Sequence, residues 1–170
     1  TPPGPRAPRG EARARYEAAL AATGRSTRVV RIAGIYGPGR TMKHAIDRGL
    51  VLFDGGPPTS RVHVTDLARI LAAMLRDDAP DLVIACDEAP APTLEVARYV
   101  MELLGEPMPS VLSLEEAEAT MSPAAREMRL GGRRCRSVER SGLIGDLTYP
   151  TYRQGMKAAL IEDGLLAPDA

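Results

Sequence analysis

A glycine-rich turn is the part of this sequence whose residue types most directly suggest ligand binding. Gly34, Gly37 and Gly39 follow a β-branched run and precede a possible helix. In phosphate-binding loops, glycines let backbone N–H groups approach a pyrophosphate at a helix N-terminus, and an acidic residue follows about 20 residues later, where this chain has Asp54. The spacing here is G-x-x-G-x-G, however, and Pro38 lacks the N–H that would face the phosphate. The crossover is also too short for a sound β-α-β unit, so we favour the alternative, a turn that needs glycine.

Three basic side chains form a second candidate site. In the stretch Arg61-Val-His63-Val64 the side chains of a strand would alternate, so Arg61 and His63 should share one face. Two arginines with a histidine could hold a phosphate or a carboxylate, and the family resemblance described below implies that Arg40 lies with Arg61 and His63. The alternatives are structural: Arg40 solvated, Arg61 paired with an acid, and His63 bonded to a backbone carbonyl.

The charge balance argues against two classes of partner. Lys and Arg (22) equal Asp and Glu (22), so no overall positive field exists to attract nucleic acid or an anionic membrane. The longest apolar run, Leu67 to Leu75, is interrupted by Arg69 and is far shorter than the roughly 20 residues that span a bilayer. We therefore expect no nucleic-acid partner and no membrane partner.

The cysteines indicate the compartment. Cys86 and Cys135 lie far apart, without C-x-x-C spacing or clustered histidines. This pattern argues against a metal site and fits two reduced thiols in a cytoplasmic protein. Cys86 lies in an apolar run and is expected to be a small core residue.

The length and the first residues set limits on the organisation of the chain. With 170 residues and 44% hydrophobic content, the chain can bury one core. The Pro-rich stretch Thr1–Pro8 cannot form a helix or a central strand, and it lacks the apolar segment of a signal peptide. We expect it to be an interior loop of a longer chain.

The predicted elements alternate between strands and helices, which is typical of an α/β fold. The predicted strands are Thr27–Ile32, which we expect to be buried on both faces, Leu50–Phe53, Arg61–Val64, Asp81–Asp87 and Arg134–Arg136. The predicted helices are Gly10–Thr23, Met42–Arg48, Asp66–Arg76, Thr93–Leu104, two that open at Ser113 and Ser122, a short one from Ser137, and one from Pro150 to about Glu162. Gly55-Gly-Pro-Pro58 predicts a turn, and Arg13 is spaced to form an ion pair with Glu17.

The helix Asp66–Arg76 has the clearest pattern. Its apolar residues recur at helical spacing, and Thr65 or Asp66 could cap its N-terminus. The residues of this stripe are Leu67, Ile70, Leu71, Met74 and Leu75.

Four segments together resemble a known family. They are Val29–Gly39, Arg61–Ala68, Val83–Asp87 and Tyr149–Met156, and they look like the C-terminal half of an extended or atypical short-chain dehydrogenase/reductase, in the NAD-dependent epimerase/dehydratase group. The resemblance implies the C-terminal part of a Rossmann-like parallel sheet with a small α/β substrate domain. Residues 1–37 and 60–88 would be the remnant of the NAD(P)-binding domain, and residues 38–59 and 89–170 the substrate-binding domain.

The resemblance also points to a departure at the catalytic positions. The family uses a Tyr-x-x-x-Lys pair, in which the lysine lowers the tyrosine pKa so that the phenol can exchange a proton. Alignment on Glu17 and Leu20 places Arg9 and Arg13 at these positions. Arginine stays protonated and cannot act as the acid or base. Tyr16 is the only tyrosine on that helix, and no lysine follows it at i+4.

The remaining site residues follow from the same resemblance. Arg40, Arg61 and His63 would face the substrate cleft. The nicotinamide end of the cofactor would meet Arg13 and the turn formed by Ala33, Gly34, Ile35 and Tyr36, although Tyr36 could equally serve to pack that turn.

The sequence thus predicts an epimerase, dehydratase or reductase-like protein that acts on a nucleotide sugar or a related small molecule. NAD or NADP would bind to an intact protein of this kind, and this chain would supply the substrate side without binding the cofactor appreciably by itself. The alternative is a non-catalytic interaction or scaffold protein of the same fold, which Arg9 and Arg13 favour. The strands near Val29–Ile32 and Leu82–Ala85 should be parallel neighbours, and an exposed edge of the first should allow a homo-oligomer.

Overall fold

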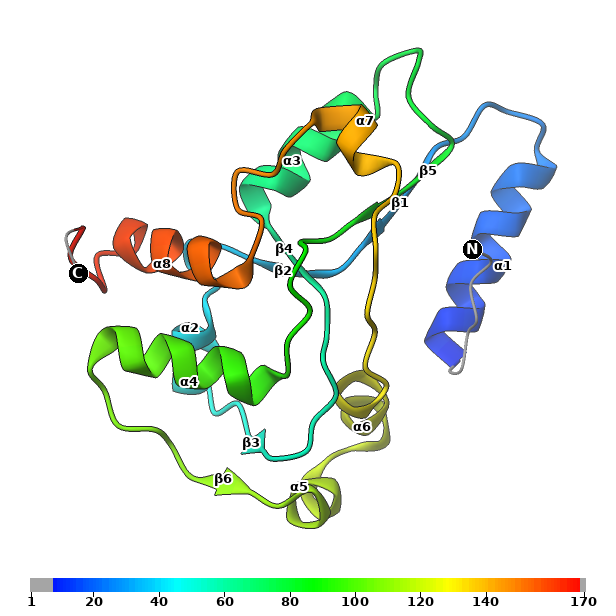
Figure 1. Ribbon diagram of the computed structural model, residues 1–170. Coiled ribbons are helices and arrows are strands. Elements are labelled where there is room, and N and C mark those ends of the chain that lie inside the picture. The colour runs from blue at the N-terminus through cyan, green and yellow to red at the C-terminus, as the bar shows by residue number, and fades with distance from the viewer. Residues whose placement is uncertain (1–7, 169–170) are drawn as a thin grey trace.

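The computed structural model describes residues 8–168, with side chains from Gly10 onward, and shows an α/β fold as predicted (Figure 1). The helices are α1 (Pro8–Ala22), α2 (Met42–Asp47), α3 (Val64–Ala73), α4 (Thr93–Leu104), α5 (Leu114–Thr120), α6 (Pro123–Leu130), α7 (Arg140–Ile144) and α8 (Tyr152–Glu162). The strands are β1 (Val29–Ile32), β2 (Gly34–Tyr36), β3 (Leu52–Phe53), β4 (Arg61–His63), β5 (Leu82–Ala85) and β6 (Val111–Leu112).

One bent segment connects the strand pairs at the centre of the molecule. β1 pairs in parallel with β5, which confirms the predicted neighbours. The Ala33 N–H still donates to Ala85 O, whereas the Gly34 N–H donates to Ser60 O, so the chain changes partner between these two residues. β2 then pairs in parallel with β4, and β3 pairs in parallel with β6. The turn at residues 33 and 34 therefore joins the β1–β5 sheet to the rest of the fold.

Two apolar clusters form the core on either side of this turn. The first, the α3 core, lies between the β strands and the helices α3 and α7, and contains Val62, Leu67, Ile70, Met74, Val83, Ala85 and Leu143. The second, the α4–α8 core, contains Tyr36, Met42, Leu52, Ala91, Leu94, Val96, Ala97, Val100, Tyr152, Met156 and Leu160. In Figure 1, α3 and α7 lie on one side of β1 and β5, and α1 lies on the other. The division into cofactor and substrate domains stays a prediction.

Several helix ends follow the predicted signals. α4 begins at Thr93 and ends at Leu104, and Gly105 adopts the left-handed conformation (φ 64°) that ends many helices. The Ser113 hydroxyl accepts the Glu116 N–H while the Glu116 carboxylate accepts the Ser113 N–H, which is the predicted capping box. Ser122 caps α6 with proline at its first turn.

Helix α3 differs from its prediction at both ends. Its N-cap is His63, whose ring accepts the Thr65 N–H, so neither Thr65 nor Asp66 is the cap. The helix ends at Ala73 instead of Arg76. The apolar stripe is only partly buried, because Leu75 is 83% exposed and Leu71 is 42% exposed. Asp66 is free to bond elsewhere because the imidazole takes over the capping role.

The structure corrects other predictions near the two ends of the chain. Residues 134–136 form no strand; this stretch is held instead by Ser60, which donates its N–H to Arg133 O and accepts the Cys135 N–H on its hydroxyl. Glu17 forms its ion pair with Arg31 at 2.6 Å rather than with Arg13. The helix expected from Ser137 begins at Arg140 as α7. β1 is only half-buried, not buried on both faces, and its last residue, Ile32, is 43% exposed.

The Asp66 carboxylate connects α3 to the segment before α8. Asp66 is 1% exposed. Its Oδ1 accepts the Thr148 N–H at 2.8 Å and an Arg69 guanidinium N–H at 2.9 Å, and its Oδ2 accepts the Tyr149 N–H at 2.9 Å. Arg69 also donates to the carbonyl oxygens of Ile144 and Asp146. The segment between α7 and α8 is therefore fixed to α3 by polar contacts.

Tyr36 connects the bent segment to α8 by close packing. Its side chain is 3% exposed and its hydroxyl lies 3.5 Å from Thr151 O. The ring packs against Gly155 of α8, where a Cβ atom would come within 2.8 Å of the Tyr36 Cζ. Glycine at position 155 is therefore required by the approach of the ring.

Removal of the Asp66 carboxylate should destabilise the fold strongly. Asp66→Ala leaves two buried N–H groups without their acceptor and removes the charged partner of Arg69, so we expect a loss of about 3–5 kcal/mol in the free energy of unfolding. Asp78→Ala is the control, because Asp78 is a highly exposed partner of Arg76. Urea denaturation of both variants measures the difference, and equal stabilities would contradict the role given to Asp66.

A methyl group at position 155 should also be costly. Gly155→Ala forces Tyr36 to move, and we expect a loss of about 1–3 kcal/mol. Gly142→Ala is the matched control, since Gly142 lies in α7 with no atom within 4 Å of the added Cβ. Helix propensity predicts a gain of about 0.5–1 kcal/mol for the control. Thermal unfolding distinguishes the two, and a neutral Gly155→Ala would show that Tyr36 is not tightly packed.

Candidate functional site

Two N–H groups of the glycine turn after β2 already have acceptors within the chain. The Gly39 N–H donates to the Asp163 carboxylate at 2.7 Å, and the Arg40 N–H donates to Gly37 O at 2.9 Å. A Cβ atom at Gly37 would lie 2.6 Å from the Val64 Cγ1, which explains the glycine by close packing. A carboxylate beside the turn would also repel a pyrophosphate. These contacts explain why the turn has glycine at these positions, and the absence of a dinucleotide fingerprint from the chain stays a prediction.

The same turn is anchored to the end of α8. Asp163 is the C-cap residue of α8, and its other oxygen lies 3.7 Å from the His44 Nδ1. His44 also completes a capping box with Thr41, with 2.8 Å between the Thr41 hydroxyl and the ring nitrogen. The turn and the start of α2 are thus held by polar contacts to α8.

His63 lies in the interior between two tyrosine rings. It is 2% exposed, with its ring centroid 5.3 Å from that of Tyr36 and 4.1 Å from that of Tyr149. Its Nδ1 accepts the Thr65 N–H at 3.2 Å, which places the ring proton on Nε2. Burial lowers the His63 pKa, so the imidazole is neutral at pH 7. Its Nε2 has no hydrogen-bond partner among the residues that the structure describes.

Arg61 also lies in the interior, and its charge is held by the backbone. It is 8% exposed, and its Nη1 donates to Thr59 O at 2.9 Å and to Ala91 O at 2.8 Å. Burial lowers the pKa of Arg61, while the nearby Asp87 carboxylate opposes this effect. Arg61 therefore joins the segment before β4 to the segment before α4.

Only one of the three predicted substrate residues is exposed. Arg61 and His63 lie on the same short strand, β4, and are both buried, whereas Arg40 is exposed at the end of the glycine turn. The structure therefore does not bring the three to one open surface by itself. Their role in substrate binding stays a prediction.

The residues expected at the cofactor differ in their surroundings. Ala33 and Gly34 use their N–H groups in the strand ladder, Ile35 is half-buried, and Tyr36 packs against α8. Arg13 is exposed on α1, and the side chain of Arg9 lies outside the described part of the chain. Any role of these residues at a nicotinamide ring stays a prediction.

Asp87 is a buried carboxyl group that the sequence did not single out. It follows β5, is 3% exposed, and neither oxygen has a hydrogen-bond partner among the described residues. Burial raises the pKa of Asp87 from 3.8 to about 6; the backbone N–H groups of Ala89 and Arg61 lie near enough, with the Arg61 charge, to offset part of the effect without forming full hydrogen bonds. The sequence did contain a sign of this burial, because Asp87 stands at the end of the apolar run Leu82–Cys86.

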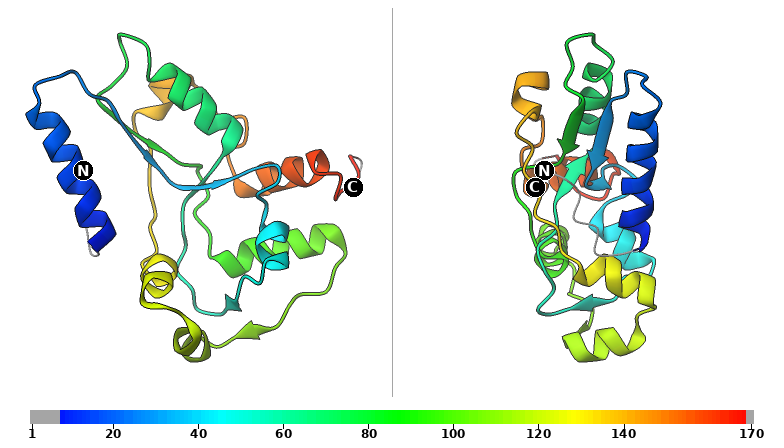
Figure 2. Two further views of the ribbon diagram at one scale, coloured as in Figure 1. Left: turned by 180° about the vertical axis from the view of Figure 1, so that it is seen from behind. Right: turned by 90° about the vertical axis from the view of Figure 1, so that its right-hand side faces the viewer.

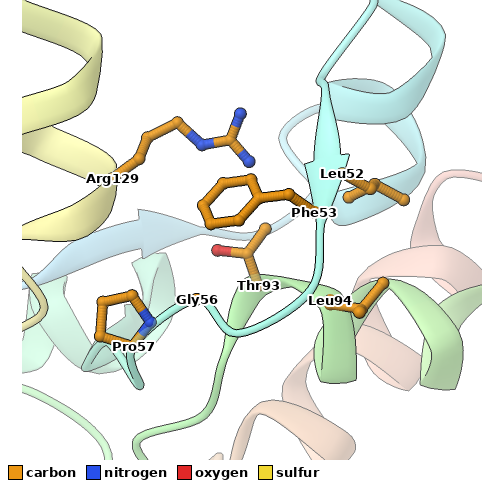
Figure 3. Close-up of a pocket in the computed structure, with 7 residues that line it drawn as sticks. All are labelled: Leu52, Phe53, Gly56, Pro57, Thr93, Leu94 and Arg129. Atoms are coloured by element: carbon orange, nitrogen blue, oxygen red, sulfur yellow. The ribbon is translucent and has the colours of Figure 1, made fainter. Parts of the chain in front are cut away.

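A small hollow lies near β3, between α4 and α6. Figure 3 shows the Arg129 guanidinium over the Phe53 ring, 4.7 Å from its centroid, with Thr93 and Pro57 nearby. The hollow holds about 10 Å³, which is room for about one water molecule. A second, open hollow of about 230 Å³ lies beside Arg76 and Glu139. Neither is lined by Arg40, Arg61 or His63.

Two further findings concern the described residues alone. They contain no group of three or more His, Cys, Asp or Glu side chains placed to hold a metal ion. No helix among them has the length and the apolar character that crossing a bilayer requires.

The Asp87 carboxyl should make stability depend on pH. Because its pKa in the folded state lies above 3.8, the folded state binds this proton more tightly than the unfolded chain does. The contribution of this proton to the free energy of unfolding is fully present below pH 4 and is lost as the pH rises through about 6. At 1.36 kcal/mol for each pKa unit, the loss amounts to about 3 kcal/mol.

Asp87→Asn keeps the shape of the side chain without its charge, so the variant should not show this loss. Urea denaturation at several pH values, with Asp78→Asn as the control, measures the effect. A pH dependence unchanged by Asp87→Asn would show that the carboxyl is not the cause.

Solved structures with the same fold exist. A conserved protein of unknown function from Silicibacter pomeroyi is 34% identical over 93% of this chain, with a TM-score of 0.77. The human epimerase family protein SDR39U1, solved with NADPH, is 21% identical over 86% of the chain (TM-score 0.68). The dTDP-glucose 4,6-dehydratase from Bacillus anthracis, solved with NAD, is 17% identical over 93% of the chain (TM-score 0.69).

The chain corresponds to only part of each of these proteins. It covers 56%, 54% and 52% of their lengths, respectively. No family model and no curated protein matches the sequence. The order of the elements, the parallel strands and these similarities show that the chain has the fold of the C-terminal portion of the NAD-dependent epimerase/dehydratase group of short-chain dehydrogenases/reductases.

Proposed function

We propose that this chain is the substrate-side half of an NAD(P)-dependent epimerase, dehydratase or reductase that acts on a nucleotide sugar or a related small molecule. The observation that carries the proposal is the likeness of the fold to proteins solved with NAD or NADPH, one of which is named for dTDP-glucose. The chain covers about half the length of those proteins, so the proposal concerns one side of a larger site.

The residues of this chain do not fit the pyrophosphate of a dinucleotide. The N–H groups of Gly39 and Arg40 already have acceptors, and the Asp163 carboxylate lies at the turn. Most of the orientation of a dinucleotide comes from backbone N–H groups at a glycine-rich helix N-terminus. We therefore assign the phosphates of the cofactor to residues outside this chain, and only contacts at the nicotinamide end to residues 33–36.

Arg40 is the residue best placed to meet an anionic substrate. It is exposed and follows the turn that leaves β2, whereas the guanidinium of Arg61 is already bonded to two carbonyl oxygens. An arginine can form bidentate, charge-assisted hydrogen bonds to a phosphate. Arg61 and His63 would then act indirectly, by holding β4 and the start of α3 in place next to that turn.

The second candidate is a non-catalytic interaction protein of the same fold. The observation that favours it is the pair Arg9 and Arg13, which stand where the resemblance places tyrosine and lysine. Arginine cannot exchange a proton near neutral pH. In this case the chain would keep the fold and its surfaces without reduction or epimerisation chemistry.

Ligand titrations test the proposed function. The wild-type chain should bind dTDP-glucose weakly in calorimetry, and Arg40→Ala should weaken the binding about tenfold through the loss of a charge-assisted contact. Arg76→Ala is the matched control, because Arg76 is exposed at the other end of the fold and pairs with Asp78.

Three results would count against this proposal. No binding of dTDP-glucose would favour the interaction protein, and equal effects of Arg40→Ala and Arg76→Ala would remove Arg40 from the site. Sub-millimolar binding of NAD to the chain alone would show that the glycine turn holds a pyrophosphate after all.

A further inference from the structure

The two cysteines of the chain are far apart in the sequence but lie at neighbouring points of the structure. Cys86 follows β5, and the N–H of the next residue, Asp87, donates to Arg61 O at 2.6 Å. Cys135 lies between α6 and α7, and its N–H donates to the Ser60 hydroxyl at 2.8 Å. Because Ser60 and Arg61 are consecutive residues, both cysteines lie next to the start of β4.

The Cys86 side chain points toward the segment that contains Cys135. The Ser137 N–H lies near enough to the Cys86 sulfur to offset part of the rise in its pKa, and the Cys135 thiol lies near enough to add to that rise. Ser137 is only two residues from Cys135. A disulfide requires two Cα atoms about 4.4–6.8 Å apart, a spacing that side-by-side backbones provide.

The segment between α6 and α7 can adjust to such a bridge. Residues 132–137 belong to no helix or strand, so a small shift breaks no ladder of hydrogen bonds. In Figures 1 and 2 the segment runs as an extended yellow to orange trace from α6 past the strands to α7. Its first part is held beside β4, because the Ser60 N–H donates to Arg133 O at 2.9 Å.

We propose that Cys86 and Cys135 are a site of redox modification, at which a reversible disulfide ties the segment between α6 and α7 to the end of β5. The chain has two cysteines, so each thiol has one possible partner within it. In reducing compartments such bridges are transient and respond to oxidants. The bridge requires neither a nucleotide sugar nor a cofactor, so it goes beyond the proposed function.

The surroundings of the two thiols set the order of the reaction. Cys86 is 1% exposed and burial raises its pKa to about 11, which makes its thiol a poor first nucleophile. Cys135 is half-buried, and the exposed residues Arg134 and Arg136 flank it. Residues 130–138 contain no acidic residue, so this stretch attracts an anionic oxidant such as oxidised glutathione. The oxidant therefore meets Cys135 first.

The reaction consumes one molecule of oxidised glutathione. The Cys135 thiolate attacks one glutathione sulfur, the S–S bond of glutathione breaks, and the first glutathione thiolate leaves. The Cys86 thiol then loses its proton to solvent, and its sulfur attacks the Cys135 sulfur and displaces the second glutathione thiolate. Two protein thiols are thus oxidised to one disulfide, and one glutathione disulfide is reduced to two thiols. Excess reduced glutathione reverses both steps.

Equilibration of the chain with glutathione buffers tests the site. Peptide mass spectrometry without reductant should find the Cys86–Cys135 bridge in the monomeric chain. A bridge that fits the fold is stabilised by the fold, so its equilibrium constant against glutathione should be at least about tenfold higher in native buffer than in concentrated urea. The oxidised chain should also unfold about 5–10 °C above the reduced one.

A displaced thiol is the matched control. Val138→Cys, made with Cys135→Ser, moves the thiol along the same segment to a position that is 72% exposed. This variant should bridge to Cys86 no better in native buffer than in urea. Cys86→Ser should stop at the mixed disulfide of Cys135 with glutathione. Circular dichroism verifies that each variant is folded.

The possible contrary results are distinct. A wild-type chain that stops at the mixed disulfide, or that forms bridges only between molecules, would overturn the proposal. A bridge that is no more stable in native buffer than in urea would show that the fold does not bring the two thiols together. An equally stable bridge in the Val138→Cys variant would show that position 135 is not special. None of these results depends on the binding of dTDP-glucose.

Discussion

The carboxylate of Asp66 is the interaction on which the rest of the structure depends. It is almost completely buried, and it accepts bonds from two successive backbone N–H groups and from Arg69. A buried carboxylate is tolerable only when such donors replace the water that it lost. Because the two backbone donors come from the segment between α7 and α8, this requirement fixes that segment relative to α3. Asp66 is available for this role because His63 caps α3.

The contacts that begin at Asp66 continue through aromatic rings to the second core. Tyr149, whose N–H bonds to Asp66, packs against His63 with its ring tilted, and His63 meets Tyr36 edge-on. Tyr36 in turn packs against Gly155 of α8. The α3 core and the α4–α8 core are thus joined by a continuous row of side chains around β4. A substitution at any of these positions should alter the packing of both cores, because protein interiors are close-packed.

The sequence predicted local features well and long-range contacts poorly. The bounds of α4, the capping box at Ser113 and the parallel pairing of β1 with β5 follow from signals within a few residues or from the alternation of elements. The burial of Arg61 and the pairing of Glu17 with Arg31 depend on segments that only folding brings together. A propensity pattern cannot show that α3 buries only part of its apolar stripe, since the sequence of a helix does not say which neighbour would cover a residue such as Leu71.

The same contrast between local patterns and long-range contacts explains why the predicted site residues are not all accessible. Sequence spacing placed Arg61 and His63 on one face of a strand, but it could not show that this face points inward. Once buried, a guanidinium must bond to fixed acceptors, and Arg61 uses the carbonyl oxygens of Thr59 and Ala91. A charge held in this way cannot turn toward a ligand without losing both of these hydrogen bonds. Of the three basic residues, only Arg40, at the end of the glycine turn, is exposed to incoming molecules, whereas Arg61 and His63 contribute to the packing around β4.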